Sequence, residues 1–329
     1  MKKQFLWLII TILALTSCKI SCELPDEVTL NKGEIKFERL EYDLFACNSV
    51  PEVLEFLNKY PVLKTEFLGS GQYPNDTILA QNLLGRIKNP YMDSLRQDVE
   101  KEFGDMEDLK VEFENAFAYL RTYDPNFPNP RIQTLVTGFG SAEMIVSDTL
   151  IIIGLDFYAG PEASFRPNEF PEYILGRFQK EYIVPAAVLI LSDSYISSDY
   201  SDFTMLADMV YYGKKYQFTK EMMPCTQDSL IIWYSEKQLE DINKNKQVIW
   251  GNFLHNELLY ETNHINKEKF LGERPNTYEI SAVCPGRIGA WVGWEIVKEY
   301  MKRNPEVTLP QLMKEPDAQK IFNNSNYRG

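Results

Sequence analysis

RIQTLVTGFGSAEMIVSDTLIIIG, residues 131–154, is the stretch that decides the fold class. It holds three short runs rich in β-branched residues, and the turn sequences Gly138-Phe139-Gly140 and Ser147-Asp148 separate them. Runs of this length and composition predict strands joined by tight turns. We therefore expect a small antiparallel meander with strands over Arg131–Thr137, Ala142–Val146 and Thr149–Gly154.

Helical patterns lie on both sides of this meander. The alternating run Glu34–Leu44 predicts one further strand start, and a helix starts near Asn48, where a cap candidate precedes Pro51. The strongest amphipathic pattern is Met106–Tyr123. The sequence therefore predicts an α+β, predominantly helical fold, with helices around a small central antiparallel sheet. The other expected helices are Asp76–Ile87, Tyr91–Phe103, Glu172–Leu191, Asp202–Met222, Ser235–Asn245, Ile249–Tyr260, Arg287–Arg303 and a short one near Pro316–Phe322.

The first residues predict export and lipidation. Lys2 and Lys3 precede the apolar run Phe5–Leu15, which is too short to span a bilayer as a helix. The run ends in Leu15-Thr16-Ser17-Cys18, which has the form of a bacterial lipobox. We expect cleavage before Cys18 and acyl chains on this cysteine, which anchor the protein to a membrane. The predicted division is a signal peptide over 1–17, a lipid-anchored tether over 18–34 and a single globular domain over 35–329.

The charge of the chain excludes one class of partner. The 329 residues carry a net charge of −13, and removal of Lys2 and Lys3 with the signal changes it to −15. Such an acidic body repels phosphate backbones, so we expect no nucleic-acid binding. It is also a poor binder of anionic lipid, so the acyl anchor must hold it at the membrane. We expect the body in the periplasm or outside the cell, and the choice between inner and outer membrane stays open.

Beyond Cys18 the chain has four cysteines: Cys22, Cys47, Cys225 and Cys284. An exported protein can form disulfides, and four cysteines allow three pairings. The sequence does not choose among these pairings, nor between a disulfide and buried free thiols. No two of these cysteines have the spacing of zinc ligands.

The residues that catalysis needs do not come together in the sequence. Its two histidines, His255 and His264, are nine positions apart and flank an expected helix end, so they do not share a helix face as zinc ligands would. No Gly-x-Ser-x-Gly elbow is present. A carboxylate pair of the glycosidase kind stays open among 47 acidic residues. We expect no catalytic residue, no metal ion and no cofactor.

Residues 285–301, PGRIGAWVGWEIVKEYM, form the most distinctive helical run. Its glycines share one face, and each costs about 1 kcal/mol relative to alanine inside a helix. Close approach of another backbone would offset that cost, so one interpretation is a core helix packed against Glu172–Leu191. An exposed aromatic docking face is the other. We also expect a carboxylate beside Arg287, which is unfavourable at a helix N-terminus. The residues of this structural or docking helix are Gly286, Arg287, Gly289, Trp291, Gly293 and Trp294.

This run resembles the C-terminal signature of the gliding-motility lipoprotein GldB family of Bacteroidetes. Further matching pieces are Arg177 with Tyr182-Ile183-Val184-Pro185, Tyr211-Tyr212-Gly213-Lys214, and Ser325 with Tyr327. The resemblance covers nearly the whole chain after the signal. It implies an anchored accessory protein of the gliding and type IX secretion machinery, of unknown biochemical activity. Together with the lipobox and the missing catalytic ligands, it leads us to expect a protein that acts through contacts with other proteins.

That family is similar in turn to predicted zinc-dependent proteases, which implies a degenerate metallopeptidase scaffold. In those relatives one helix carries His-Glu-x-x-His and a later helix supplies a glutamate before a glycine. The corresponding helices here are Glu172–Leu191, which has no histidine, and Asp202–Met222, in which Tyr212 precedes Gly213. The resemblance therefore predicts an inactive scaffold. The alternative is a cell-envelope hydrolase, either metallopeptidase-like or carboxylate-based.

The tripeptide Asp-(Ser/Thr)-(Ile/Leu) recurs in the chain more often than the roughly one match that average composition gives. It resembles the O-glycosylation sequon of exported Bacteroidetes proteins. Capping of turns and helices explains it equally well, since these residue types favour such places. The possible acceptor residues are Thr77, Ser94, Thr149 and Ser229.

Overall fold

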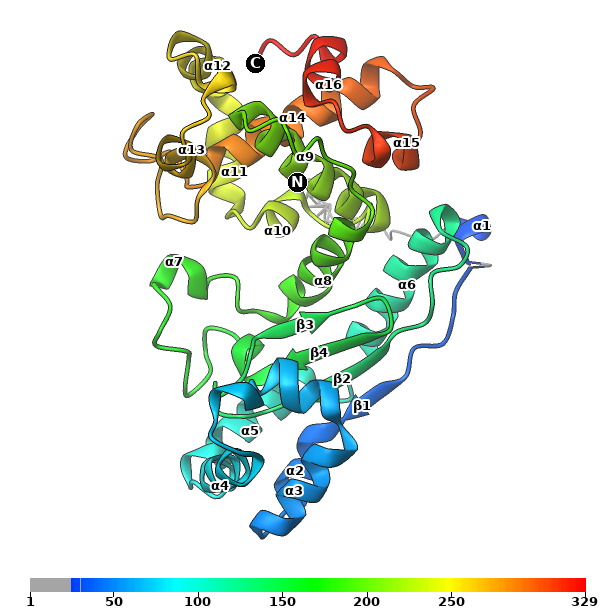
Figure 1. Cartoon of the computed structure of the whole chain (residues 1–329), viewed down its shortest axis with the longest axis vertical. Coiled ribbons are helices and arrows are strands. Elements are labelled where there is room, and N and C mark those ends of the chain that lie inside the picture. Colours follow the sequence, from blue (N-terminus) through cyan, green and yellow to red (C-terminus); the bar gives the residue numbers. More distant parts are fainter. Residues whose placement is uncertain (1–24, 30) are drawn as a thin grey trace, which may run out of the picture.

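The computed structural model describes residues 25–29 and 31–329. A small sheet with its helices forms one half of the molecule, and a bundle of helices that contains the C-terminus forms the other (Figure 1). The predicted α+β, predominantly helical class is confirmed. The predicted signal peptide, Cys18 and Cys22 lie outside the described residues.

The sheet of the described chain is mixed. Its order is β1-β2-β4-β3, in which β2 pairs parallel with both β1 and β4, while β3 pairs antiparallel with β4. The predicted antiparallel meander is therefore wrong, because β4 lies between β2 and β3. The strands are β1 (Phe37–Arg39), β2 (Arg131–Leu135), β3 (Met144–Val146) and β4 (Leu150–Gly154).

The loop after β2 gives the physical reason. The backbone amides of Thr137 and Phe139 donate hydrogen bonds to Oδ2 of the buried Asp156, at 3.2 and 2.7 Å. Phe139 adopts a left-handed φ of 61° there. The loop is thus folded around a carboxylate and does not turn straight back into a neighbouring strand.

Helices cover both faces of the sheet. Because alternate residues of a strand point to opposite faces, each strand contributes side chains to the core on both sides. Leu135 and Ile152 face one cluster of buried residues, and Ile132 and Ile153 face the other. The first face is covered by α2 (Leu40–Ala46), α3 (Val50–Lys59), the π-turn η1 (Leu63–Phe67) and α4 (Asp76–Ile87). The 3₁₀ turn η2 (Ser70–Gln72) follows η1 and has no buried residue. The second face is covered by α5 (Tyr91–Phe103), α6 (Glu107–Tyr123), η3 (Leu155–Tyr158) and the helical half.

The described part of the predicted tether lies against α6. It includes the short helix α1 (Asp26–Thr29), whose Val28 is buried. Nη1 of Arg121 donates to the carbonyl oxygen of Asn31 at 3.0 Å, and Nδ2 of Asn31 donates to Oγ1 of Thr122 at 3.3 Å. These contacts fix the chain on the body before β1 begins.

The predicted helix Glu172–Leu191 is not continuous. The structure has α7 (Glu172–Leu175), the 3₁₀ turn η4 (Lys180–Tyr182) and α8 (Ile183–Leu191) in its place. Pro185 lies in the first turn of α8. A missing N–H costs nothing there, because the first amides of a helix have no partner within it.

The helical half is built around two long helices, α9 and α14, with shorter helices about them (Figure 1). The predicted helix Ile249–Tyr260 is shorter in the structure, and ends at His255. The elements are η5 (Ser192–Ser194), α9 (Met205–Met222), α10 (Asp228–Ile232), α11 (Glu236–Lys244), α12 (Lys246–His255), η6 (Leu258–Tyr260), α13 (His264–Leu271), α14 (Ile288–Arg303), α15 (Leu309–Lys314) and α16 (Ala318–Ser325).

α14 packs against α9, and the predicted neighbour Glu172–Leu191 is wrong. The two helices cross at Gly213 and Gly293: a methyl group on Gly213 would overlap the carbonyl group of Gly293, and one on Gly293 would overlap that of Met209. Gly289 instead faces Leu271 of α13. α14 is buried along most of its length, including Trp294.

Candidate functional site

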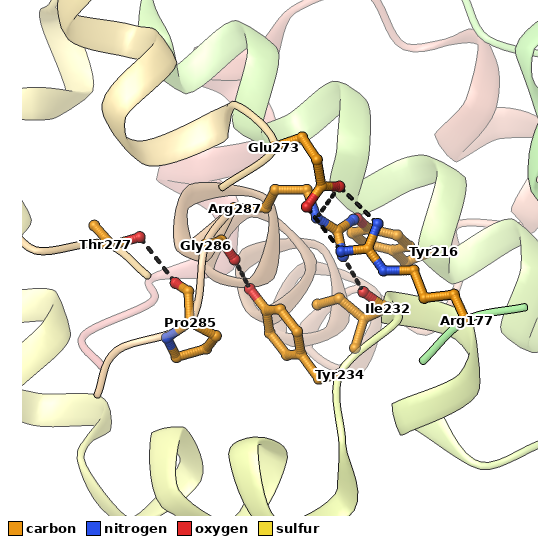
Figure 2. A network of polar contacts seen from close by, with 9 residues as sticks. All are labelled: Arg177, Tyr216, Ile232, Tyr234, Glu273, Thr277, Pro285, Gly286 and Arg287. Carbon is orange, nitrogen blue, oxygen red and sulfur yellow. Dashed lines mark hydrogen bonds and ion pairs between the residues drawn. The ribbon is translucent and has the colours of Figure 1, made fainter. Parts of the chain in front are cut away.

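A network of charged and polar groups lies where α9, α10 and the start of α14 meet (Figure 2). At its centre, Nη1 and Nη2 of Arg177 donate to the two carboxylate oxygens of Glu273, at 2.7 and 2.8 Å. Nε of Arg287 lies 3.3 Å from Oε2 of the same carboxylate. Glu273 therefore supplies the carboxylate that the sequence predicts beside Arg287.

Arg287 itself is buried and uses its remaining donors on the surrounding elements. Its Nη2 donates to the carbonyl oxygen of Ile232 at 2.7 Å, and its Nη1 donates to the hydroxyl of Tyr216 at 3.2 Å (Figure 2). Its backbone has a left-handed φ of 57° at the N-cap of α14. Such a conformation is unusual for a residue with a side chain, so the contacts of the guanidinium must hold it.

The loop before α14 is fixed by two further hydrogen bonds. The hydroxyl of Tyr234 donates to the carbonyl oxygen of Gly286 at 2.6 Å, and the hydroxyl of Thr277 donates to that of Pro285 at 2.8 Å (Figure 2). Both hydroxyls are buried, where an unpaired carbonyl group would cost free energy. The loop that presents Arg287 is thus held at both of its last residues.

Two guanidinium groups share one carboxylate and one aromatic ring. The Cζ atoms of Arg177 and Arg287 each lie 5.3 Å from the centre of a ring of Trp233. Burial works against ionisation of Glu273, but the hydrogen bonds from Arg177 and the charges of both arginines hold its pKa below the usual value. The network therefore stays ionised and carries one net positive charge.

A small cavity adjoins the network on the side of the sheet. Its volume is about 100 Å³, and Arg177 and Trp233 of the network are among the residues that line it. Within the described chain, Nε of Arg177 has no hydrogen-bond partner. Burial raises the pKa of Tyr158, so that its hydroxyl stays protonated. The lining residues are Glu143, Met144, Tyr158, Ile174, Arg177, Phe178, Tyr182, Ala186, Ile190 and Trp233.

The side of α8 that lines this cavity carries no imidazole. Tyr182, Ala186 and Ile190 follow one another at intervals of one turn there. A zinc-binding helix would place two histidines at such an interval. His255 and His264 lie instead at the end of α12 and the start of α13. The described residues include no group of three or more His, Cys, Asp or Glu that could hold a metal ion.

The structure places the other predicted site residues apart from this network. Thr77, Ser94 and Thr149 are exposed, whereas Ser229 is 4% exposed in α10 and cannot be modified unless this helix opens. Cys47 and Cys284 are buried free thiols. Burial raises the pKa of Cys284 to about 12, so that its thiol is inert.

Sequence reasoning singled out both arginines of the network but missed Glu273, Tyr216 and Trp233. Nothing distinguishes Glu273 among 47 acidic residues, because its partners are distant in sequence. Trp233 has a left-handed φ of 62°, and no residue pattern around it predicts this conformation. A glycine at such a position would have been a visible signal, because glycine adopts positive φ without steric cost.

No helix among the described residues has the length and apolar character that crossing a membrane requires. Fold and site thus define a mostly helical α+β protein whose most elaborate polar contacts hold its own elements together. The sequence profile of one family, described as gliding motility protein GldB, matches residues 21–329. The chain belongs to this family of gliding motility lipoproteins, as its sequence predicts. No curated protein and no solved structure matches the chain.

Proposed function

We propose that this member of the family acts as a membrane-anchored accessory lipoprotein of the gliding and type IX secretion machinery, working through contacts with other proteins and without catalysis. Family membership supports the role in gliding. The anchor would be Cys18, with the body in the periplasm or outside the cell.

The observation that carries the non-catalytic part is the state of Glu273. Both of its oxygens are bound by Arg177, and Arg287 adds a second positive charge. A general acid or base needs a carboxyl group whose pKa lies near the working pH and which is free to exchange a proton. Glu273 has a lowered pKa and no free oxygen, which suits an internal clamp.

The composition of the cavity supports the same proposal. Apolar residues of α8 occupy the side on which an active metallopeptidase-like scaffold would carry its ligands. Gly213 of α9, which follows Tyr212, is used for the close crossing with α14. These positions serve packing, as expected for a degenerate scaffold.

A hydrolase is the second candidate, and one observation favours it. Glu143 and Tyr158 both line the cavity, and neither forms a side-chain hydrogen bond within the described chain. Removal of water from Glu143 raises its pKa, and the charge of Arg177 only partly opposes this. A carboxyl group of raised pKa beside a protonated hydroxyl is a combination that acid–base chemistry can use.

A deletion strain and purified protein together test the proposal. Deletion should abolish colony spreading and secretion, and the gene for the full chain should restore both. A Cys18→Ala variant should remain unlipidated and leave the membrane fraction in a carbonate wash. A deletion strain that spreads and secretes normally would contradict the proposed role. Stoichiometric zinc in the purified protein, or chelator-sensitive peptide cleavage, would favour the hydrolase.

A further inference from the structure

β3 is an edge strand of the sheet, with β4 on one side only. In this pair the backbone amide of Ser147 donates to the carbonyl oxygen of Leu150 at 2.9 Å. Because bonded residues alternate along an antiparallel pair, Met144 and Val146 direct their N–H and C=O groups away from β4. Within the described chain no hydrogen bond reaches these groups. The edge therefore offers a row of donors and acceptors that another extended backbone would match.

The cavity beside this edge has the size of a side chain. Met144 lines it together with Ala186 and Ile190 of α8, the helix that packs beside β3. Pockets for cofactors and drug-sized ligands occupy about 300–1,000 Å³. At about 100 Å³, this cavity has room for one apolar side chain of a bound segment. Ile190 is 42% exposed at its rim, although it is a large apolar residue.

The charge around the edge selects the composition of that segment. The hairpin 143–154 has no basic residue and carries the exposed acid Asp148 at its turn, while Glu143 lines the cavity. Arg131 of β2 pairs with Leu150, and its guanidinium group lies 3.9 Å from Glu38. Arg177, which lines the cavity, has both Nη atoms on Glu273. An acidic edge attracts lysine and arginine and repels acidic segments.

We propose that β3 and its cavity are a docking site for an extended segment of a partner protein. The segment pairs with Met144 and Val146 as an added strand, inserts one apolar side chain between β3 and α8, and carries lysine or arginine beside it. This inference rests on the proposed function, for which it supplies the class of partner and the place of contact.

The first experiment finds the segment in living cells. A photoreactive amino acid replaces Ile190 in the full chain, and the cross-linked peptide is mapped by mass spectrometry. The same amino acid at Val248, an exposed position on α12, is the control for non-specific capture. We expect one segment from a second protein at position 190, extended, with an apolar residue beside lysine or arginine.

The second experiment measures binding of the mapped segment, as a synthetic peptide, to purified full-length protein. Val146→Pro removes an edge donor, and Val146→Ala is its matched control because it keeps the N–H. Ala186→Phe fills the cavity, and Ala186→Ser is its control. Proline and phenylalanine should each weaken binding about tenfold, the value of one hydrogen bond or one buried side chain, while the controls stay within about twofold. Added peptide should also slow amide exchange at Met144 and Val146.

The outcomes separate this proposal from the proposed function. A cross-link to this chain's own residues, no cross-link above the Val248 control, or equal binding by all four variants would overturn the docking site. If Val146→Pro fails to fold, Ala186→Phe alone decides. A deletion strain that lacks motility, with Ala186→Phe motile at normal abundance, overturns docking and leaves the proposed function standing. A motile and secreting deletion strain overturns the proposed function whatever is cross-linked.

Discussion

Two contacts between elements differ in how closely they are packed: the crossing of α9 and α14, and the junction between β3 and α8. At the crossing, Gly213 and Gly293 bring two backbones into contact, and no room remains for a methyl group. At the junction, a cavity of about 100 Å³ adjoins an unpaired strand edge. The crossing has no space for a larger side chain, whereas the junction has space for an additional one.

Two carboxyl groups, one in each half of the molecule, also differ in whether arginine pairs with them. Beside the crossing, the carboxylate of Glu273 is matched by two arginines. In the half that contains the sheet, Glu112 of α6 accepts no hydrogen bond from the described chain, and burial raises its pKa to about 7. A paired carboxylate in a packed region supports the fold, whereas an unpaired buried carboxyl group costs free energy when it ionises. The comparison suggests which half can be changed without loss of the fold.

The largest expected effect comes from the crossing. Gly293→Ala places a methyl group against the carbonyl group of Met209, which cannot move without shifting α9, so it should destabilise the protein by about 3 kcal/mol or more. Gly251→Ala in α12 is the matched control, because its added methyl meets nothing and should stabilise by about 0.5–1 kcal/mol. Urea denaturation measures both. Equal stability of the two variants would show that the crossing is not closely packed.

Glu273→Ala should cost about 2–3 kcal/mol, because it leaves two guanidinium groups facing each other without their shared carboxylate. The partial exposure of Glu273 reduces this cost below that of a fully buried pair. Glu240→Ala, which breaks an exposed pair with Lys244, is the control and should leave the midpoint unchanged. Thermal unfolding compares them, and equal midpoints would refute a clamp.

Glu112→Gln should stabilise the protein by about 2 kcal/mol above pH 7, because burial raises the pKa of this carboxyl to about 7 and ionising it in the folded state is costly. The raised pKa favours folding below the pKa of the unfolded chain, about 4.5, and this contribution disappears as pH rises through 7. The gain of the variant should therefore vanish near pH 4. Urea denaturation at several pH values measures it, and a gain independent of pH would exclude titration of Glu112 as the cause.

The smallest expected effect is that of Tyr234→Phe, which removes the hydrogen bond to Gly286 and should cost about 1 kcal/mol. Tyr278→Phe, at an exposed ring, should cost nothing. Both are read from urea denaturation midpoints. If Tyr234→Phe is as stable as the control, the loop before α14 does not depend on this bond.

Local patterns predicted most of the helices, because capping residues and apolar spacing act within a few positions. Ser235, for example, caps α11 together with Gln238 where the sequence indicates a helix start. The order of the strands could not be predicted in this way. The strand order depends on Asp156, which follows β4 in the sequence. Its carboxylate accepts hydrogen bonds from the loop after β2 and fixes the path of that loop.

The same limit applies to the site. The glycines of α14 indicated a close backbone contact, but the identity of the neighbour depended on Gly213, which lies far away in the sequence. Arg287 indicated a carboxylate nearby. That this carboxylate is Glu273 depends on the three-dimensional fold and cannot be derived from sequence spacing. Periodicity reports which face of a helix is apolar and not which element covers that face.

The pairing of β1 with β2 gives the molecule an order of assembly. Phe37 lies beside Ile132, so 95 residues separate the two partners along the chain. During synthesis β1 is made first and has no partner strand until α2 to α6 and then β2 have been made. Closing so long a loop is slow compared with forming a local helix. We therefore expect the sheet to form late in folding, and a chain that ends before residue 131 to leave Phe37–Arg39 without a strand to pair with.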